Sequence, residues 1–258
     1  MSTHTRQERL RAAVDITEIA ARTSMRHFRR VSGFDTKSDE SPVTIADRET
    51  EGRIRDLLEE RFPEDHIFGE EMGRSGSSDR TWIIDPIDGT RSFIAGLPLF
   101  GMLLGFQDPS DSPVGVIRMP ALGEVYAGAP GLGATRNEEP IHVSQCKHLS
   151  EAKLFINEGD KLAVQEPDVF KRLVGAGQLR RMGADCYAHA LVAAGSIDAV
   201  VDFDLQPYDY LPVAAVVEAA GGVMTDWSGA PLTLNSDGRT LTASTPELHA
   251  ELMALVAT

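Results

Sequence analysis

The chain has 258 residues, of which 42% are hydrophobic and 25% are charged, and its net charge is −14. This length is enough for one large core or for two closely packed halves. The acidic balance disfavours a general nucleic-acid partner, because non-specific binding to phosphates needs a basic face. An enzyme of this charge that acts on an anionic phosphate ester would need cations in its site.

Cysteine content and hydropathy indicate where the protein works. Only Cys146 and Cys186 are present, without a CxxC pair, so neither a disulfide scaffold nor a cysteine zinc site is expected. The N-terminus carries charges throughout and lacks the apolar core of a signal peptide. No run approaches the ~18 apolar residues of a membrane span. We therefore expect a cytoplasmic protein with no membrane partner.

The first half of the chain is predicted to hold two helices followed by a mostly antiparallel sheet. Apolar residues at helical spacing predict helices over 6–30 and from 44 to Pro63, with a polar loop over 32–42 between them. The segment 73–79, GRSGSSD, is expected only to join elements. Short apolar runs predict strands over 81–85, 99–106, 114–119 and 124–128.

The second half alternates between strand-like and helical patterns, which indicates a layered α/β arrangement. Strands are predicted over 153–157, 199–203 and 223–226. Helices are predicted over 168–174, 184–194, 211–220 and 246–256. Because 131–140 is rich in turn residues, we expect a boundary near 135–150, between an N-terminal half, 1–140, and a C-terminal half, 141–258.

The most informative stretch for chemistry is 82–92. An apolar strand runs into Asp85, Asp88 follows three residues later, and Gly89 permits a close backbone approach. Thr90 can start a helix over 91–95. Carboxylates at a strand end bind hard divalent ions, and the amides of a helix N-terminus bind phosphate. Taken alone, two such aspartates more often cap a turn.

Three further acids each have an alternative explanation as well. Glu70, in GEE (69–71), could belong to a solvated surface pair. Asp47, in VTIAD (43–47), could form a capping box with Thr44. Asp209 could be a favourable acid at the N-terminus of the helix predicted over 211–220.

Together, four motifs resemble the inositol monophosphatase superfamily over essentially the whole chain: VTIAD (43–47), GEE (69–71), WIIDPIDGT (82–90) and YDYLPVAAVVEAAGG (208–222). The resemblance implies an α+β fold built as a layered αβαβα sandwich, and usually a homodimer. It also implies a phosphomonoesterase that holds two or three Mg²⁺ ions per site.

The resemblance carries ligand roles onto particular residues. Glu70, Asp85 and the backbone carbonyl of Ile87 are similar to the ligands of a first Mg²⁺. Asp85, Asp88 and Asp209 are similar to the ligands of a second. Glu70 would also face a third, weaker metal site, and it counts with the catalytic groups. Two cations about 3.5–4 Å apart can bind both the attacking and the leaving oxygen of a phosphoryl transfer.

The remaining roles concern water, phosphate and a loop. Thr90 is similar to the family threonine that pairs with Asp47 to activate the attacking water. Thr90 alone is a poor base, but Asp47 could accept a proton through it. Asp88 and the backbone of Gly89 and Thr90 would hold the phosphate. Lys37 corresponds to a family lysine on a mobile loop beside the metals.

Within the superfamily, the segments 90–105, 183–195 and 204–212 resemble bacterial histidinol-phosphate phosphatases. Asp185 stands where inositol monophosphatases have a small neutral residue, and Asp202 matches an acid on the leaving-group side. Two acids suit a cationic alcohol such as histidinol better than a neutral polyol, although Asp185 could instead cap the following helix. We expect hydrolysis of L-histidinol phosphate, a small-molecule phosphate ester in histidine biosynthesis, by a metal-activated water. An inositol-1-monophosphatase or small-sugar monophosphatase is the alternative, and a non-catalytic binding protein is a third.

Overall fold

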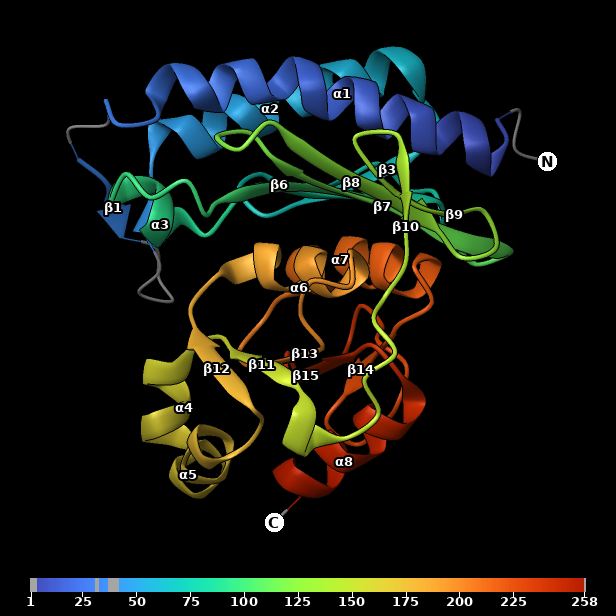
Figure 1. Ribbon diagram of the computed structural model, residues 1–258. Coiled ribbons are helices and arrows are strands. Elements are labelled where there is room, and N and C mark those ends of the chain that lie inside the picture. The colour runs from blue at the N-terminus through green and yellow to red at the C-terminus, as the bar shows by residue number, and fades with distance from the viewer. Residues whose placement is uncertain (1–3, 31–32, 37–41, 258) are drawn as a thin grey trace.

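The computed structural model describes residues 4–30, 33–36 and 42–257. Figure 1 shows five layers. Helices α1 (Arg6–His27) and α2 (Ile45–Arg61) cover one face of a first sheet, and helices α6 (Asp185–Ala193) and α7 (Pro207–Ala219) lie between this sheet and a second one. The other side of the second sheet is covered by α4 (Gly159–Gln165), α5 (Pro167–Gly175) and α8 (Pro246–Val256). The predicted αβαβα sandwich of the α+β class is confirmed.

The first sheet has eight strands in the spatial order β10-β9-β8-β7-β6-β5-β3-β4. All neighbours are antiparallel except β3 and β5, which run parallel. The strands are β3 (His66–Gly69), β4 (Gly73–Ser75), β5 (Thr81–Asp88), β6 (Gly101–Asp108), β7 (Asp111–Met119), β8 (Glu124–Ala129), β9 (Gly133–Arg136) and β10 (Glu139–Ile141). A separate antiparallel pair joins β1 (Asp35–Thr36) to β2 (Pro42–Val43).

The second sheet has five strands in the order β12-β11-β13-β15-β14. The strand β11 is parallel to both of its neighbours, and β15 is antiparallel to both of its own. The strands are β11 (Lys153–Ile156), β12 (Leu179–Met182), β13 (Ala199–Asp202), β14 (Val223–Asp226) and β15 (Thr240–Ala243). The carboxyl ends of β11 and β13 therefore meet at one edge of the sheet, facing the site described below.

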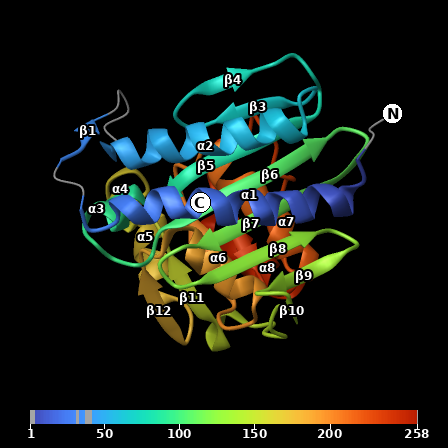
Figure 2. The ribbon, with the colours of Figure 1, turned by 90° about the horizontal axis from the view of Figure 1, so that it is seen from above.

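A row of paired glycines lets α7 lie close against the first sheet. Gly105, Gly115 and Gly128 are register partners on β6, β7 and β8, which Figure 2 shows side by side. A Cβ atom at Gly115 would lie 2.0 Å from the carbonyl oxygen of Pro212, and one at Gly128 would lie 2.8 Å from Cβ of Ala219. Larger residues in this row would push α7 away, and with it the acid in its first turn.

Several predicted elements differ from those observed. The segment 73–79 was expected only to join elements, but Gly73–Ser75 forms β4 at the edge of the first sheet. Edge strands are often short and carry polar or charged side chains, and β4 has only three residues, so it shows no apolar pattern in the sequence. The helix α7 begins at Pro207 rather than at 211, and α1 ends at His27 rather than near 30. Among the described residues, further strands and helices that were not predicted are β1 and β2, which lie in and beside the predicted loop 32–42, and β3, β9, β10, α4, β12 and β15.

The predicted halves, 1–140 and 141–258, correspond closely to the strands of the two sheets, but α6 and α7 of the second half pack on the first sheet. The division into halves stays a prediction. Within the described ranges, no helix is long and apolar enough to cross a membrane.

Candidate active site

An irregularity in β5 turns two aspartates toward one site. In a regular strand, residues three apart point to opposite faces of the sheet. Asp85 pairs with Leu103 of β6 and Asp88 pairs with Gly101, so β5 has one more residue than its partner between these two pairs. Such a bulge re-aims the side chains beside it, and here both carboxylates reach the same group.

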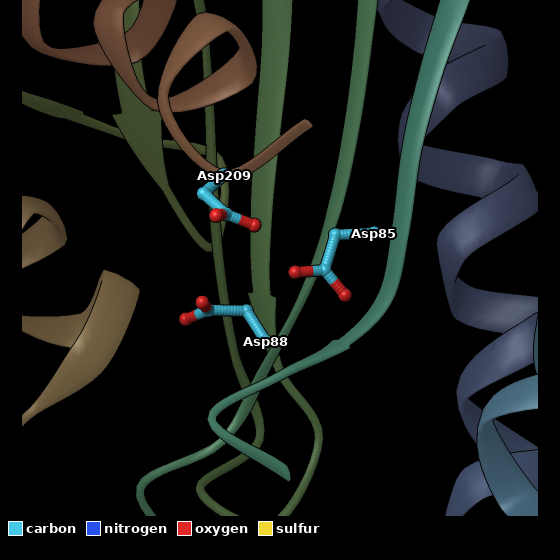
Figure 3. Close-up of side chains that lie close together, drawn as sticks. All are labelled: Asp85, Asp88 and Asp209. Carbon is cyan, nitrogen blue, oxygen red and sulfur yellow. The ribbon is translucent and has the colours of Figure 1, made fainter. Parts of the chain in front are cut away.

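The third carboxylate, Asp209, comes from the first turn of α7. Figure 3 shows Asp85, Asp88 and Asp209 around a common space, two from β5 and one from the helix. Each offers one oxygen atom, and these three oxygens lie within 4.8 Å of one another. An all-oxygen donor set of this kind suits a hard divalent cation, so the residues present fit the expected Mg²⁺.

The electrostatics of the three carboxylates also fit a cation. Burial, together with the charges of Glu70, Asp88 and Asp209, raises the pKa of Asp85 well above that of an ordinary aspartate. Burial, followed by the charges of Asp88 and Glu70, does the same for Asp209. Burial also raises the pKa of Asp88. A bound divalent ion would compensate this concentrated negative charge.

Glu70 follows β3, and its loop is held by a buried glutamate. The side chain of Glu51 accepts the backbone N–H groups of Glu71 (2.7 Å) and Met72 (3.1 Å) and the Nε of Arg55 (2.7 Å). Glu51 is fully buried on α2. The α2 helix therefore braces the backbone directly after the predicted metal ligand, Glu70.

The structure brings Asp47 and Thr90 together. The Thr90 hydroxyl lies 3.3 Å from Oδ1 of Asp47 and 3.0 Å from the carbonyl oxygen of Ile87. The other oxygen of Asp47 accepts from the backbone N–H (2.8 Å) and the hydroxyl (2.6 Å) of Thr44. The capping box and the contact with Thr90 therefore coexist, because each uses a different oxygen of one carboxylate.

The acids face a cavity of about 640 Å³ whose lining includes Glu70, the turn after β5, the start of α6 and the end of β13. Asp185 projects from the start of α6 toward Gly89, where a Cβ atom would lie 2.6 Å from its Oδ2. That Oδ2 also accepts from the hydroxyl of Ser92 at 3.1 Å. Burial, followed by the charge of Asp88, raises the pKa of Asp185 to about 8.

Asp202 lines the same cavity, but its oxygens have protein partners. Oδ2 accepts from Nδ2 of Asn157 (2.7 Å) and lies 3.0 Å from Nε2 of His189, while Oδ1 accepts from the backbone N–H of Phe203 (2.9 Å). The residue is only 2% exposed. Its carboxylate is therefore already engaged by groups of the protein itself. The predicted loop residue Lys37 lies outside the described residues.

The cavity residues between β11 and α4, and on α4 itself, were not predicted from the sequence. Glu158 and Lys161 line the rim, where the Lys161 Nζ lies 3.0 Å from Oε2 of Glu158, and Arg91 lies 3.5 Å from the same oxygen. Asn157 is buried beneath them. A signal was available, because Asn157 ends a predicted strand in the way that Asp85 does.

Comparison with known proteins places this geometry in context. The family model described as the inositol monophosphatase family matches residues 5–258. A histidinol-phosphatase of Chlorobaculum parvum is 38% identical over 233 residues, which are 89% of this chain and 90% of the relative. A fructose-1,6-bisphosphatase/inositol-1-monophosphatase of Aquifex aeolicus is 31% identical over 84% of this chain and 87% of its own length. The structure of an inositol monophosphatase from Zymomonas mobilis has a TM-score of 0.88 at 33% identity, covering 98% of this chain and 99% of that one.

Proposed function

This chain belongs to the inositol monophosphatase family of phosphatases, and we propose that it hydrolyses L-histidinol phosphate to L-histidinol and phosphate with Mg²⁺ as its cofactor. The observation that carries the proposal is Asp185, a carboxylate held beside Gly89 in the cavity that contains the acidic group. An acid at this position suits a leaving alcohol that carries an ammonium group. The histidinol-phosphatase among the relatives supports the same substrate.

The proposed metal ligands are Glu70, Asp85, Asp88, Asp209 and the carbonyl of Ile87, for two Mg²⁺ ions, with a third weaker site at Glu70. The close group of carboxylate oxygens and their raised pKa values support this assignment. When bound, the ions supply positive charge that stabilises the phosphoryl oxygens and lowers the pKa of water.

The proposed proton path uses Thr90 and Asp47. The Thr90 hydroxyl receives a proton from the attacking water and passes its own proton to Oδ1 of Asp47, 3.3 Å away. The amides of Gly89 and Thr90 orient the phosphate beside Asp88, and the left-handed backbone of Gly89, with φ of 81°, lets that turn approach closely.

The proposed selectivity comes from negative charge on the leaving-group side. Asp185 contacts the ammonium of histidinol, and the buried Asp202 adds charge behind it. A charge-assisted contact of this kind contributes about 1.5–3 kcal/mol, which is enough to separate a cationic alcohol from a neutral polyol. We also propose a cytoplasmic location and a homodimer.

An inositol or small-sugar phosphate is the second candidate substrate, because the Aquifex aeolicus relative carries those activities in its name. A phosphate-release panel with purified protein and Mg²⁺ decides between the two. It compares histidinol phosphate, inositol 1-phosphate, fructose 1,6-bisphosphate and adenosine bisphosphate at matched concentrations. We expect kcat/KM for histidinol phosphate to exceed the others by at least about tenfold. A higher kcat/KM for inositol 1-phosphate would overturn the proposed substrate, and no phosphate release from any ester would overturn the phosphatase.

A further inference from the structure

We propose that Asn157 is a positioning residue for substrate selection, because it fixes the backbone that aims Asp185 at the leaving group. This inference rests on the proposed function, in that it takes Asp185 to be the residue that selects the ester. Asn157 lies directly after β11 and is 2% exposed. It joins the carboxyl end of β13 to the start of α6, although it lies 28 residues from Asp185 and 45 residues from Asp202 in the sequence.

The amide of Asn157 uses both of its ends. Its Oδ1 accepts the backbone N–H of Ala184 at 3.2 Å. Its Nδ2 donates to the backbone carbonyl of Asp185 at 3.1 Å and to Oδ2 of Asp202 at 2.7 Å. The Asn157 side chain therefore hydrogen-bonds to the backbone of both residue 184 and residue 185, and its own hydrogen bond to the buried carboxylate of Asp202 fixes its orientation.

These hydrogen bonds are needed because the backbone of Asp185 has an unfavourable conformation. Its φ is 46°, in the left-handed region that residues with a side chain rarely adopt. Such a conformation persists only where the surroundings determine it. The next residue is held from the opposite side, since the backbone N–H of Cys186 donates to Oδ2 of Asp88 at 2.7 Å.

The two anchors together set the direction of the Asp185 side chain. With its backbone fixed, the Asp185 carboxylate reaches the hydroxyl of Ser92 and lies against Gly89, beside the proposed phosphate position. Without the amide of Asn157, residues 184 and 185 can relax toward ordinary backbone angles. The carboxylate then leaves the position where it would meet the ammonium of the substrate, and the preference for histidinol phosphate over inositol 1-phosphate falls.

A double-mutant cycle tests this role. The variants are Asn157→Leu, which has the same branching at Cγ but no hydrogen-bonding groups, Asp185→Ala and the double variant. The measured quantity is the ratio of kcat/KM for histidinol phosphate to kcat/KM for inositol 1-phosphate. We expect Asn157→Leu alone to lower the ratio at least about fivefold, and to change it less than about twofold once Asp185 is already alanine. A merely structural role would lower both values of kcat/KM together and leave the ratio unchanged.

Thr242→Val is the matched control. The hydroxyl of Thr242 lies 2.9 Å from Nδ1 of His189, and Nε2 of the same ring lies 3.0 Å from Asp202. Loss of this hydroxyl therefore disturbs the same buried network without removing any hydrogen bond of Asn157. We expect its ratio to stay within about twofold of wild type. An equal shift in Thr242→Val and Asn157→Leu, or an equal effect of Asn157→Leu in both backgrounds, would overturn the positioning role.

If Asn157→Leu does not fold, Asn157→Thr takes its place in the same cycle. One hydroxyl cannot make all three contacts of the amide. We therefore expect a ratio of the two kcat/KM values between that of wild type and that of Asp185→Ala, and a ratio equal to wild type would overturn the inference. The wild-type ratio by itself tests the proposed substrate, whereas the coupling between positions 157 and 185 tests the inference. Their failures are therefore distinguishable.

Discussion

Asp88 offers a way to separate chemistry from folding at a single position. Its carboxylate lies in the acidic group and accepts from the backbone N–H of Cys186, and burial raises its pKa. Asp88→Asn keeps the shape and removes the charge. We expect phosphate release at saturating Mg²⁺ to fall on the order of 100-fold or more, while the melting temperature without metal is unchanged or higher, because repulsion among the acids is reduced.

The control for this prediction is Asp79→Asn, the same chemical change at an exposed acid between β4 and β5. It should leave both turnover and melting temperature at the wild-type values. Turnover by Asp88→Asn at the wild-type rate in saturating Mg²⁺ would remove Asp88 from the proposed ligand set.

Asp185 is the residue at which the choice of ester is expected to depend on one charge. Asp185→Ala removes the proposed contact with the ammonium of histidinol, so KM for histidinol phosphate should rise about tenfold or more. The KM for inositol 1-phosphate should change much less. Steady-state kinetics with both esters measure this difference, and an unchanged preference between them would show that Asp185 does not select the substrate.

At the scale of the element, α2 is a brace for the site as well as a cover for the sheet. Asp47, Glu51 and Arg55 are one turn apart, so they lie on one face of the helix, and all three are buried. Asp47 meets Thr90, while Glu51 holds the backbone at 71 and 72. Helical periodicity identifies the apolar face of α2, but it does not indicate that a polar face is buried as well.

Glu51→Gln should destabilise the fold as well as the metal loop. The substitution leaves the Arg55 guanidinium, 2.7 Å from Glu51, without its ionic partner in a buried site. Breaking a buried pair from one side costs about 3–5 kcal/mol, which urea unfolding would measure. Glu59→Gln on the exposed face of the same helix is the matched control and should stay within about 0.5 kcal/mol of wild type. A similar small effect of Glu51→Gln would contradict a bracing role for this pair.

At the scale of the whole molecule, the acidic cavity couples stability to pH and metal. The pKa values of Asp85, Asp88, Asp185 and Asp209 are all raised above 3.8, the ordinary aspartate value. The metal-free fold is therefore favoured while these groups are protonated. That stability is lost as the pH rises from 3.8 through about 8, the folded-state pKa of Asp185.

Melting curves in EDTA should therefore show a melting temperature that falls as the pH rises across this window. Mg²⁺ should reverse the loss at the upper end, since a ligand at 100 times its Kd adds about 2.7 kcal/mol. Asp209→Asn should flatten the pH dependence in EDTA, because it removes one of the repelling charges. A melting temperature that is independent of both pH and Mg²⁺ would contradict this account of the acidic group.

Local sequence patterns determined much of this protein. Period and turn chemistry predicted the strands that became β5, β7 and β8 and the helices α2, α6 and α8, because their apolar faces are continuous in the sequence. Four motifs also predicted the fold and the acids at 85, 88 and 209. Short strands that mix polar and apolar residues, such as β4, β12 and β15, have too few residues to show a hydrophobic period. Their pairing depends on neighbouring strands that a local sequence pattern does not identify.

Only the tertiary structure decided how the predicted acids are used. Residue types at 85, 88 and 209 indicated a metal site, but the bulge in β5 and the close approach of α7 bring their oxygens together. From the sequence, Asp185 and Asp202 were both expected to face the leaving group. In the structure, Asp185 projects toward Gly89, whereas the carboxylate of Asp202 contacts Asn157 and His189. A side chain's partners depend on contacts between distant segments, and a local pattern carries no information about these.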